Sequence, residues 1–268
     1  MRVLGLDPSL TAFGWAVHDT DATGLSRCVS RGRFKTSAKT LYISRYQDLR
    51  ARLRALIVEQ RPDHMGIEFP VFGNLFSEGL YGLFLYCSEA IKEERQDVVF
   101  WSPLQIKAHA REGMGKARPK GWQMMKPDMV EAAKSDTGFK GVWNHNEADA
   151  YLCARLSARF WLLYDGLLKE SDLSPLEVKY FLEIKRYSRG KQAGKEVQKG
   201  LMYREDERFF RWSEDPDDVS TEVDEDGNER SHSPEVGEVG EHLGSSEEGV
   251  EDGRLDGEPR PCPASGVP

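Results

Sequence analysis

The chain has 268 residues, of which 39% are hydrophobic, and its formal net charge is −8. The charge is unevenly spread: residues 213–268 contain 18 acidic residues, three arginines and no lysine or aromatic residue, which gives −15 there and leaves +7 for the rest. Such a tail cannot bury enough apolar surface to offset its ordering entropy, so we expect it to be disordered. The basic remainder favours a polyanionic partner.

The four cysteines are far apart in the sequence and do not form the close pairs typical of a zinc site. We interpret them as free thiols in a reducing compartment. No apolar run is long enough to span a bilayer, and strand-like residues follow Met1 without a leader pattern. These features predict a cytoplasmic protein with no membrane partner, in the host cytoplasm if the chain is encoded by a phage.

Hydrophobic periodicity predicts five strands and two helices in the first hundred residues. In chain order they are strands at 3–6, 14–18 and 27–34, an amphipathic helix at about 40–60, a strand at 65–69, a helix at about 75–95 and a strand at 97–101. Three strands followed by helix, strand, helix and strand make an α/β order in which the later strands join by crossovers. This is the ribonuclease H-like order, a mixed sheet flanked by helices.

Two more helices are predicted downstream, one beginning at Pro127 and ending at Gly138, and one from Asn146 to about Tyr164. Residues 173–212 mix basic and aromatic side chains and are interpreted as a helical extension. The predicted organisation is a nuclease-like domain at 1–165, a basic and aromatic extension at 166–212 and an acidic tail at 213–268. There is no internal repeat.

Two acidic residues stand where predicted strands end. Asp7 is followed by Pro8, which helps to stop the strand, although an isolated aspartate there is also typical of a turn. Glu68 ends an apolar run, and a lone charge in a buried run needs a cation or a hydrogen-bonding partner. If the two strands are neighbours, both carboxylates meet at one edge of the sheet.

A third acid, Asp149, begins the last predicted helix. Asn146 and His145 precede it by three and four residues, so each pair shares a helix face. Taken alone, these residues fit an ordinary polar first turn. With Asp7 and Glu68, this turn becomes the third wall of a hard-oxygen site suited to Mg²⁺ or Mn²⁺, and two such ions can promote the hydrolysis of a phosphodiester.

Other enzyme classes find little support. No serine lies in a nucleophile elbow, and there is neither a P-loop nor a dinucleotide-binding fingerprint.

Three short motifs, in order, resemble those of the RuvC-type Holliday junction resolvases: Leu4-Gly5-Leu6-Asp7-Pro8-Ser9 with Thr11 and Gly14, Ile67-Glu68 followed by Val71-Phe72, and Glu147-Ala148-Asp149-Ala150. The resemblance covers residues 1–165, and residues 166–268 have no counterpart. It implies a homodimer that binds a four-way junction and makes paired nicks with two metal ions in each active site.

The resemblance also implies site residues. Asp7, Glu68, Asn146 and Asp149 match the metal-facing positions. Lys107 and Lys126 resemble basic positions near the scissile strand, and Lys126 is counted among the catalytic residues. Asn146 stands where the family usually has an acid or sometimes histidine, so His145 or Glu147 is an alternative fourth ligand. The helix around Leu80 and Phe84 matches one that packs against its twin, although a buried monomeric helix has the same pattern.

Six basic residues are predicted to contact nucleic acid. They surround a glycine-containing stretch with Trp122 and are Lys107, Arg111, Lys116, Arg118, Lys120 and Lys126. We interpret this stretch as a mobile basic loop over a phosphate backbone, or else as a solvated loop. Phe72 resembles an aromatic residue that stacks at the junction centre. Phe69 is an alternative for that role, and a core aromatic is the alternative for both.

The function predicted from these features is a structure-selective endonuclease that resolves four-way junctions and other branched DNA. The alternatives are a nuclease of the same fold that acts on flap or RNA substrates, and a non-catalytic module that binds branched DNA. A lone nuclease domain with a divergent tail is also consistent with a phage origin.

Overall fold

The structure, a computed structural model, describes residues 1–20, 26–69, 77–115, 123–138 and 141–182, together with four short strands towards the C-terminus. Residues 1–211 with 256–268 form one compact unit. Residues 212–255 form a second unit, and they lie outside the described residues. The predicted acidic tail therefore also lies outside them, apart from residues 260–261.

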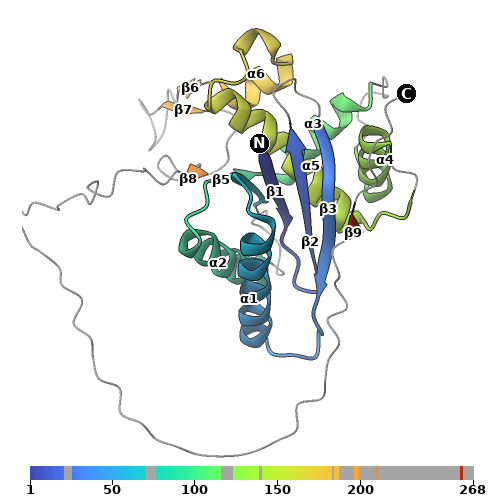
Figure 1. Ribbon diagram of the computed structural model, residues 1–268, viewed down its shortest axis with the longest axis vertical. Helices are drawn as coiled ribbons and strands as arrows, with labels where there is room; N and C mark the ends of the chain where they lie inside the picture. Colours follow the sequence, from blue (N-terminus) through green and yellow to red (C-terminus); the bar gives the residue numbers. More distant parts are fainter. Residues whose placement is uncertain are drawn as a thin grey trace, which may run out of the picture. The chain divides into compact units, whose positions relative to one another are not determined.

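The predicted order of five strands and two helices in the first hundred residues is confirmed, as are the two helices predicted downstream (Figure 1). The strands are β1 (Arg2–Asp7), β2 (Ala12–Thr20), β3 (Ser26–Lys35), β4 (His64–Glu68) and β5 (Val98–Trp101). The helices are α1 (Tyr42–Gln60), α2 (Ser77–Glu93), α3 (Pro103–Gly113), α4 (Lys126–Thr137), α5 (His145–Tyr164) and α6 (Pro175–Phe181), with a 3₁₀ turn at Glu170–Asp172.

The strands form a mixed sheet whose order places the two strand-end acids together. From one edge to the other the order is β8, β5, β4, β1, β2, β3 and β9, in which β8 (Phe209–Phe210) and β9 (Arg260–Pro261) are two-residue strands. The central strand β1 runs antiparallel to β2 and parallel to β4, with Leu6 opposite Ile67. Asp7 and Glu68, at the C-terminal ends of these two parallel strands, therefore lie at the same end of the sheet. The predicted ribonuclease H-like fold is confirmed.

Helix α5 lies directly on the sheet because two glycines leave room for its backbone. A Cβ atom on Gly5 of β1 would stand 2.2 Å from the carbonyl oxygen of Ala150, and one on Gly14 of β2 would stand 2.2 Å from that of Asn146. Real Cβ atoms do not approach backbone so closely, so any larger residue would push the helix away. This close contact brings the first turn of α5 to the edge where Asp7 lies.

Helix α3 was not predicted. Its signals are the N-cap Ser102, whose side chain accepts a hydrogen bond from the Gln105 amide, and Pro103 in the first turn. The interpretation of residues from Lys107 onward as a loop is therefore wrong for Lys107 and Arg111, which lie on this helix. Three other predicted contacts, Lys116, Arg118 and Lys120, lie outside the described residues.

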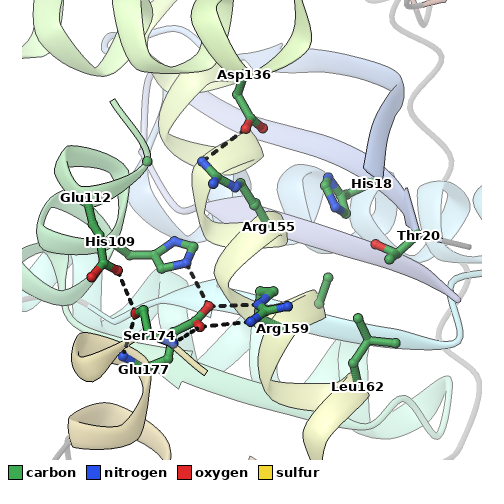
Figure 2. A pocket seen from close by; sticks show the side chains of 12 residues that line it. His18, Thr20, His109, Glu112, Asp136, Arg155, Arg159, Leu162, Ser174 and Glu177 are labelled. Carbon is green, nitrogen blue, oxygen red and sulfur yellow. Dashed lines mark hydrogen bonds and ion pairs between the residues drawn. The ribbon is translucent and has the colours of Figure 1, made fainter. Parts of the chain in front are cut away.

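Helix α6 belongs to the predicted extension and docks on α3 and α5 through one buried carboxylate (Figure 2). Glu177 accepts hydrogen bonds from Arg159 of α5 at 2.8 and 2.9 Å, and it lies 3.3 Å from Nε2 of His109 on α3. These donors and the Ser174 amide hold the pKa of Glu177 well below its usual range against the effect of burial. The residues border a polar cleft of about 420 Å³ at the C-terminal half of α5.

Beyond Leu182 the described part of the extension consists of strands where the sequence pattern predicted helix. These are β6 (Ile184–Arg186), which pairs with β7 (Glu196–Gln198), and β8, whose Phe209 pairs with Val99 of β5. Aromatic residues fit a strand as well as a helix, so this mixed composition did not separate the two.

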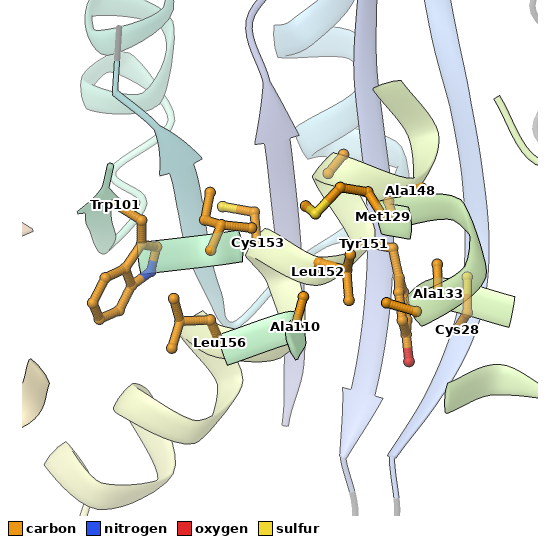
Figure 3. Close-up of a cluster of buried hydrophobic side chains, with 14 of the residues drawn as sticks. Cys28, Trp101, Ala110, Met129, Ala133, Ala148, Tyr151, Leu152, Cys153 and Leu156 are labelled. Atoms are coloured by element: carbon orange, nitrogen blue, oxygen red, sulfur yellow. The ribbon is translucent and has the colours of Figure 1, made fainter. Parts of the chain in front are cut away.

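The core has two parts, one on each face of the sheet. Leu4 and Leu6 of β1 pack with residues of α1 and α2, whereas the face on which Gly5 lies is covered by α5. On that second face, residues of α3, α4, α5 and α6 form a continuous apolar cluster, part of which Figure 3 shows. The alternation of side chains along β1 thus separates the layers.

Candidate active site

The acidic residues line one pocket of about 240 Å³ at the sheet edge. Its walls are formed by Asp7, Ser9, Glu68, Pro103, Lys107, Lys126, Met129, His145, Asn146 and Asp149. All five residues predicted to be catalytic are among them, together with His145 and Lys107. Segments as far apart as β1 and α5 therefore meet here, as the strand-end positions predict.

Each acid is placed by the end of a regular element. Asp7 is the last residue of β1 and Glu68 the last of β4, two neighbouring parallel strands. Asp149 lies in the second turn of α5, whose first turn is fixed by the Asn144 side chain accepting a hydrogen bond from the Asn146 amide. Ser9, which was not singled out from the sequence, joins the pocket because it follows Asp7 and Pro8 in the turn after β1.

The three carboxylates repel one another. Burial, followed by the charges of Glu68 and Asp149, raises the pKa of Asp7 well above its usual value. Burial and the charge of Asp149 likewise raise the pKa of Glu68, and burial raises that of Asp149 to about 6. A cation in the pocket would reverse this effect because it favours the ionised forms.

Two lysines face these carboxylates. The charge of Lys107 opposes the rise in the pKa of Glu68 and of Asp149, and that of Lys126 opposes it for Asp7 and Asp149. Lys126 lies at the start of α4 with its Nζ atom 3.3 Å from Nε2 of His145. The pocket is therefore lined by carboxylates from β1, β4 and α5 and by ammonium groups from α3 and α4.

Asn146 is buried, with 6% of its surface exposed, and its side-chain orientation is fixed. Its Nδ2 atom donates a hydrogen bond to the carbonyl oxygen of Ala12 in β2. The ring of His145 also hydrogen-bonds the Asn146 side chain, and the amide oxygen Oδ1 is the atom that could act as a ligand in the pocket.

Glu147 does not complete the site. It is buried and forms an ion pair at 3.2 Å with Arg31 of β3, itself only 2% exposed. The Arg31 guanidinium also lies over the ring of Trp143, 4.0 Å from its centroid. The alternative of Glu147 as fourth ligand is wrong, because this residue faces β3 and is absent from the pocket walls.

None of the other residues predicted to contact nucleic acid is found in the pocket among the described residues. Arg111 is exposed on α3, one turn beyond Lys107, and does not line the pocket. Phe72 lies outside the described residues. Phe69, the alternative to Phe72, is buried in the core, where its ring lies 4.6 Å from that of Phe84 and edge-on to it. The core interpretation is therefore correct for Phe69.

The donor set suits a hard divalent cation, although the acids do not converge on a common point. Within the described ranges, no three His, Cys, Asp or Glu side chains are close enough to enclose an ion. The buried Oδ1 atom of Asp149, however, has no hydrogen-bond partner among the described residues. A buried carboxylate oxygen without a donor is costly, and a cation would satisfy it.

Comparisons with known proteins agree with the motif resemblance. The chain is 36% identical over 66 residues to a curated protein named crossover junction endodeoxyribonuclease RuvC from Erythrobacter litoralis. That match covers 25% of this chain and 40% of the relative, so the chain spans less than half of the relative's length. No protein-family model matches the chain.

Two solved structures of RuvC from Thermus thermophilus share the fold. One is the protein alone, with a TM-score of 0.51 and 21% identity, and the other is its complex with a Holliday junction substrate, with a TM-score of 0.50 and 20% identity. Each match covers 63% of this chain and 99% of the RuvC chain. The described part of the chain contains no helix that is long and apolar enough to cross a membrane.

Proposed function

We propose that this chain, which has the fold of the RuvC resolvases, is a divalent-metal-dependent endonuclease that resolves four-way junctions and other branched DNA. The observation that supports this proposal most strongly is the pocket in which Asp7, Glu68 and Asp149 face Lys107 and Lys126. Carboxylates bind divalent cations, and lysines bind phosphate, so the two halves of the pocket suit a cation and a phosphodiester together.

The proposed cofactor is Mg²⁺, with Mn²⁺ as a substitute, and two ions in each site. The oxygen ligands would come from Asp7, Glu68, Asp149 and the amide of Asn146. When bound, such ions activate water and stabilise the leaving 3′ oxygen. The raised pKa values of the acids and the unsatisfied Oδ1 atom of Asp149 support this assignment. A bound cation would make ionisation of the buried acids favourable and would give the Oδ1 atom a partner.

The protein's own residues position the substrate. Lys107 of α3 and Lys126 of α4 would bind the non-bridging oxygens of the scissile phosphate. The neutral ring of His145 accepts a hydrogen bond from Lys126 and keeps its ammonium group at the pocket edge. Burial and the charges of Lys126 and Arg33 lower the pKa of His145, which keeps the ring in this accepting form.

The proposed partners are branched DNA and a second copy of the chain. A four-way junction has two symmetric strands to be cut, so paired nicks require two sites related by a two-fold axis. The Thermus thermophilus RuvC complex with a Holliday junction substrate supports branched DNA as the substrate class.

The test is nicking of labelled substrates by the full-length protein. A synthetic four-way junction, a linear duplex of the same sequence and an RNA–DNA hybrid are compared in Mg²⁺, in Mn²⁺ and in excess chelator. We expect metal-dependent nicking of the junction in symmetric pairs. Cleavage of the hybrid alone would favour the alternative RNA substrate, and binding of the junction without cleavage in either metal would favour the non-catalytic module.

A further inference from the structure

Helix α3, which carries Lys107, has few apolar contacts of its own. Only four of its eleven residues are buried, two of them polar and two apolar. In chain order they are Gln105, Ile106, His109 and Ala110. A helix of this length is marginal by itself, so its position depends on what it packs against. The partners of its polar residues therefore matter for where Lys107 lies.

The partner of His109 is a carboxylate from α6, a helix of the extension. Oε1 of Glu177 lies 3.3 Å from Nε2 of His109 and accepts a hydrogen bond from Nε of Arg159 at 2.8 Å. Its Oε2 accepts one from a second nitrogen of Arg159 and one from the Ser174 amide, both at 2.9 Å. Only 4% of Glu177 is exposed, so these donors take the place of water around it. As Figure 2 shows, this one carboxylate joins α3, α5 and α6.

Two further contacts connect α6 with α3. The hydroxyl of Ser174, the N-cap of α6, donates a hydrogen bond to Oε2 of Glu112 on α3 at 2.7 Å. At the other end of α6 the buried ring of Phe181 lies 5.8 Å from that of Trp101, which immediately precedes the cap of α3. Helix α6 therefore contacts both the approach to α3 and its C-terminal half, and Lys107 lies between these contacts.

We propose that Glu177 is a positioning residue, through which the extension holds α3 with Lys107 directed at the carboxylates of the pocket. Helix α6 lies beyond residue 165, where the resemblance to the RuvC motifs ends. Glu177 is not among the residues that line the pocket, so its effect on cleavage passes through α3. This inference rests on the proposed nuclease function and gives the extension a part in it.

Glu177→Gln disturbs this contact with little change in shape. The carboxylate accepts hydrogen bonds on both oxygens, whereas an amide has one oxygen that accepts and one nitrogen that donates. Because Arg159 donates to both positions, the new NH₂ group faces a donor in either orientation. We therefore expect α3 to be held less firmly. Junction binding should change little, because it depends on several basic residues.

The test is a double-mutant cycle with Lys107→Gln, in the full-length protein with Mg²⁺. Single-turnover nicking of a four-way junction is measured beside a gel shift. We expect Glu177→Gln to slow nicking by about tenfold and to leave junction affinity within about twofold. Lys107→Gln should slow nicking at least as much, and the double variant should be no slower than Lys107→Gln. Glu170→Gln, the same change at an exposed position of the extension, is the matched control and should nick at the unaltered rate.

A role in stability alone predicts a different pattern. Glu177→Gln would then slow nicking by the same factor with Lys107 present or replaced, and that result would overturn the inference. Nicking by Glu177→Gln at the unaltered rate would overturn it as well. Ser174→Ala removes only the contact with Glu112 and the cap of α6, so it is a milder second variant and should show the same dependence on Lys107.

Hydrogen exchange gives a readout that does not depend on cleavage. The amides of α3 should exchange faster in Glu177→Gln than in the unaltered protein, whereas those of α1 should not change. Equal exchange of α3 in the two proteins would overturn the inference. Failure of the unaltered protein to nick any junction would instead reject the proposed function, and the exchange of α3 would still decide whether Glu177 holds this helix.

Discussion

Adjacent residues at the start of α5 have different partners because a helix directs successive side chains to different faces. Asn146 faces the acidic pocket, and Glu147 faces β3, where it pairs with Arg31. The sequence showed that Asn146 shares a face with Asp149, since this follows from helical spacing. The sequence did not show which of Asn146 and Glu147 is the ligand, because Arg31, the partner of Glu147, lies 116 residues away in the chain.

His18 gives a prediction for acid stability. It is fully buried beside Tyr151, and burial lowers its pKa from 6.5 to about 4, with the nearby charge of Asp136 opposing the shift. Between these two values the unfolded chain binds a proton that the folded protein does not. The stability linked to His18 is therefore complete above pH 6.5 and is lost as the pH falls towards 4.

We expect the free energy of unfolding to fall by about 3 kcal/mol more between pH 7 and pH 4 in the unaltered protein than in His18→Gln. Urea unfolding at several pH values measures the difference. All other titrating groups are shared by the two proteins, so parallel pH curves would show that His18 is not held neutral by the fold.

At the scale of elements, the site depends on how closely α5 lies on β1 and β2. The positions of the strands and of α5 could be predicted from periodicity, as could the meeting of Asp7 with Glu68. The pocket wall formed by α3 was not predicted, because the helix cap at Ser102 was not recognised and Lys107 was assigned to a loop. The role of Gly14 is visible only when the helix that covers it is seen.

Gly14→Ala tests this close contact. The added methyl group would overlap the carbonyl oxygen of Asn146, so the first turn of α5 must move away from Asp7. We expect a loss of about 1–3 kcal/mol in stability and a fall in nicking rate even where the variant is fully folded. Gly138→Ala, at the end of α4, is the control. Its φ of 66° makes alanine unfavourable there, but among the described residues other than its chain neighbours no atom lies within 4 Å of the added Cβ. Gly138→Ala should lose stability but should still nick the junction at the unaltered rate at a temperature at which it is fully folded.

At the scale of the whole molecule, paired cutting predicts a dimer. Helix α2 exposes Tyr81 and Leu85, four residues apart on one helix face and each more than 40% exposed. We expect Leu85→Asp to shift the protein from dimer to monomer in light scattering at micromolar concentration. Val58→Asp on α1, which is also an exposed apolar position, should leave the dimer intact. A monomer that still cuts junctions in symmetric pairs would contradict this arrangement.

The acidic tail gives a second prediction at this scale. A segment of charge −15 joined to a remainder of charge +7 has a high effective concentration near the DNA-binding surface. Removal of residues 213–268 should therefore tighten binding of linear duplex more than that of junctions, and the difference should fade as salt rises. Equal duplex binding by truncated and full-length protein at low salt would show that the tail only solvates the chain.

The central claim is that Asp7, Glu68 and Asp149 form the catalytic site of a nuclease. The most direct measurement is nicking of a four-way junction beside a gel shift of the same junction, for Asp7→Asn, Glu68→Gln and Asp149→Asn. Asp48→Asn, a partly exposed acid of α1 paired with Arg52, is the control. We predict that each of the three variants binds the junction and fails to nick it, because binding depends on basic residues and cleavage on the carboxylates. Near-normal nicking by any one of the three, with the control unchanged, would contradict the assignment.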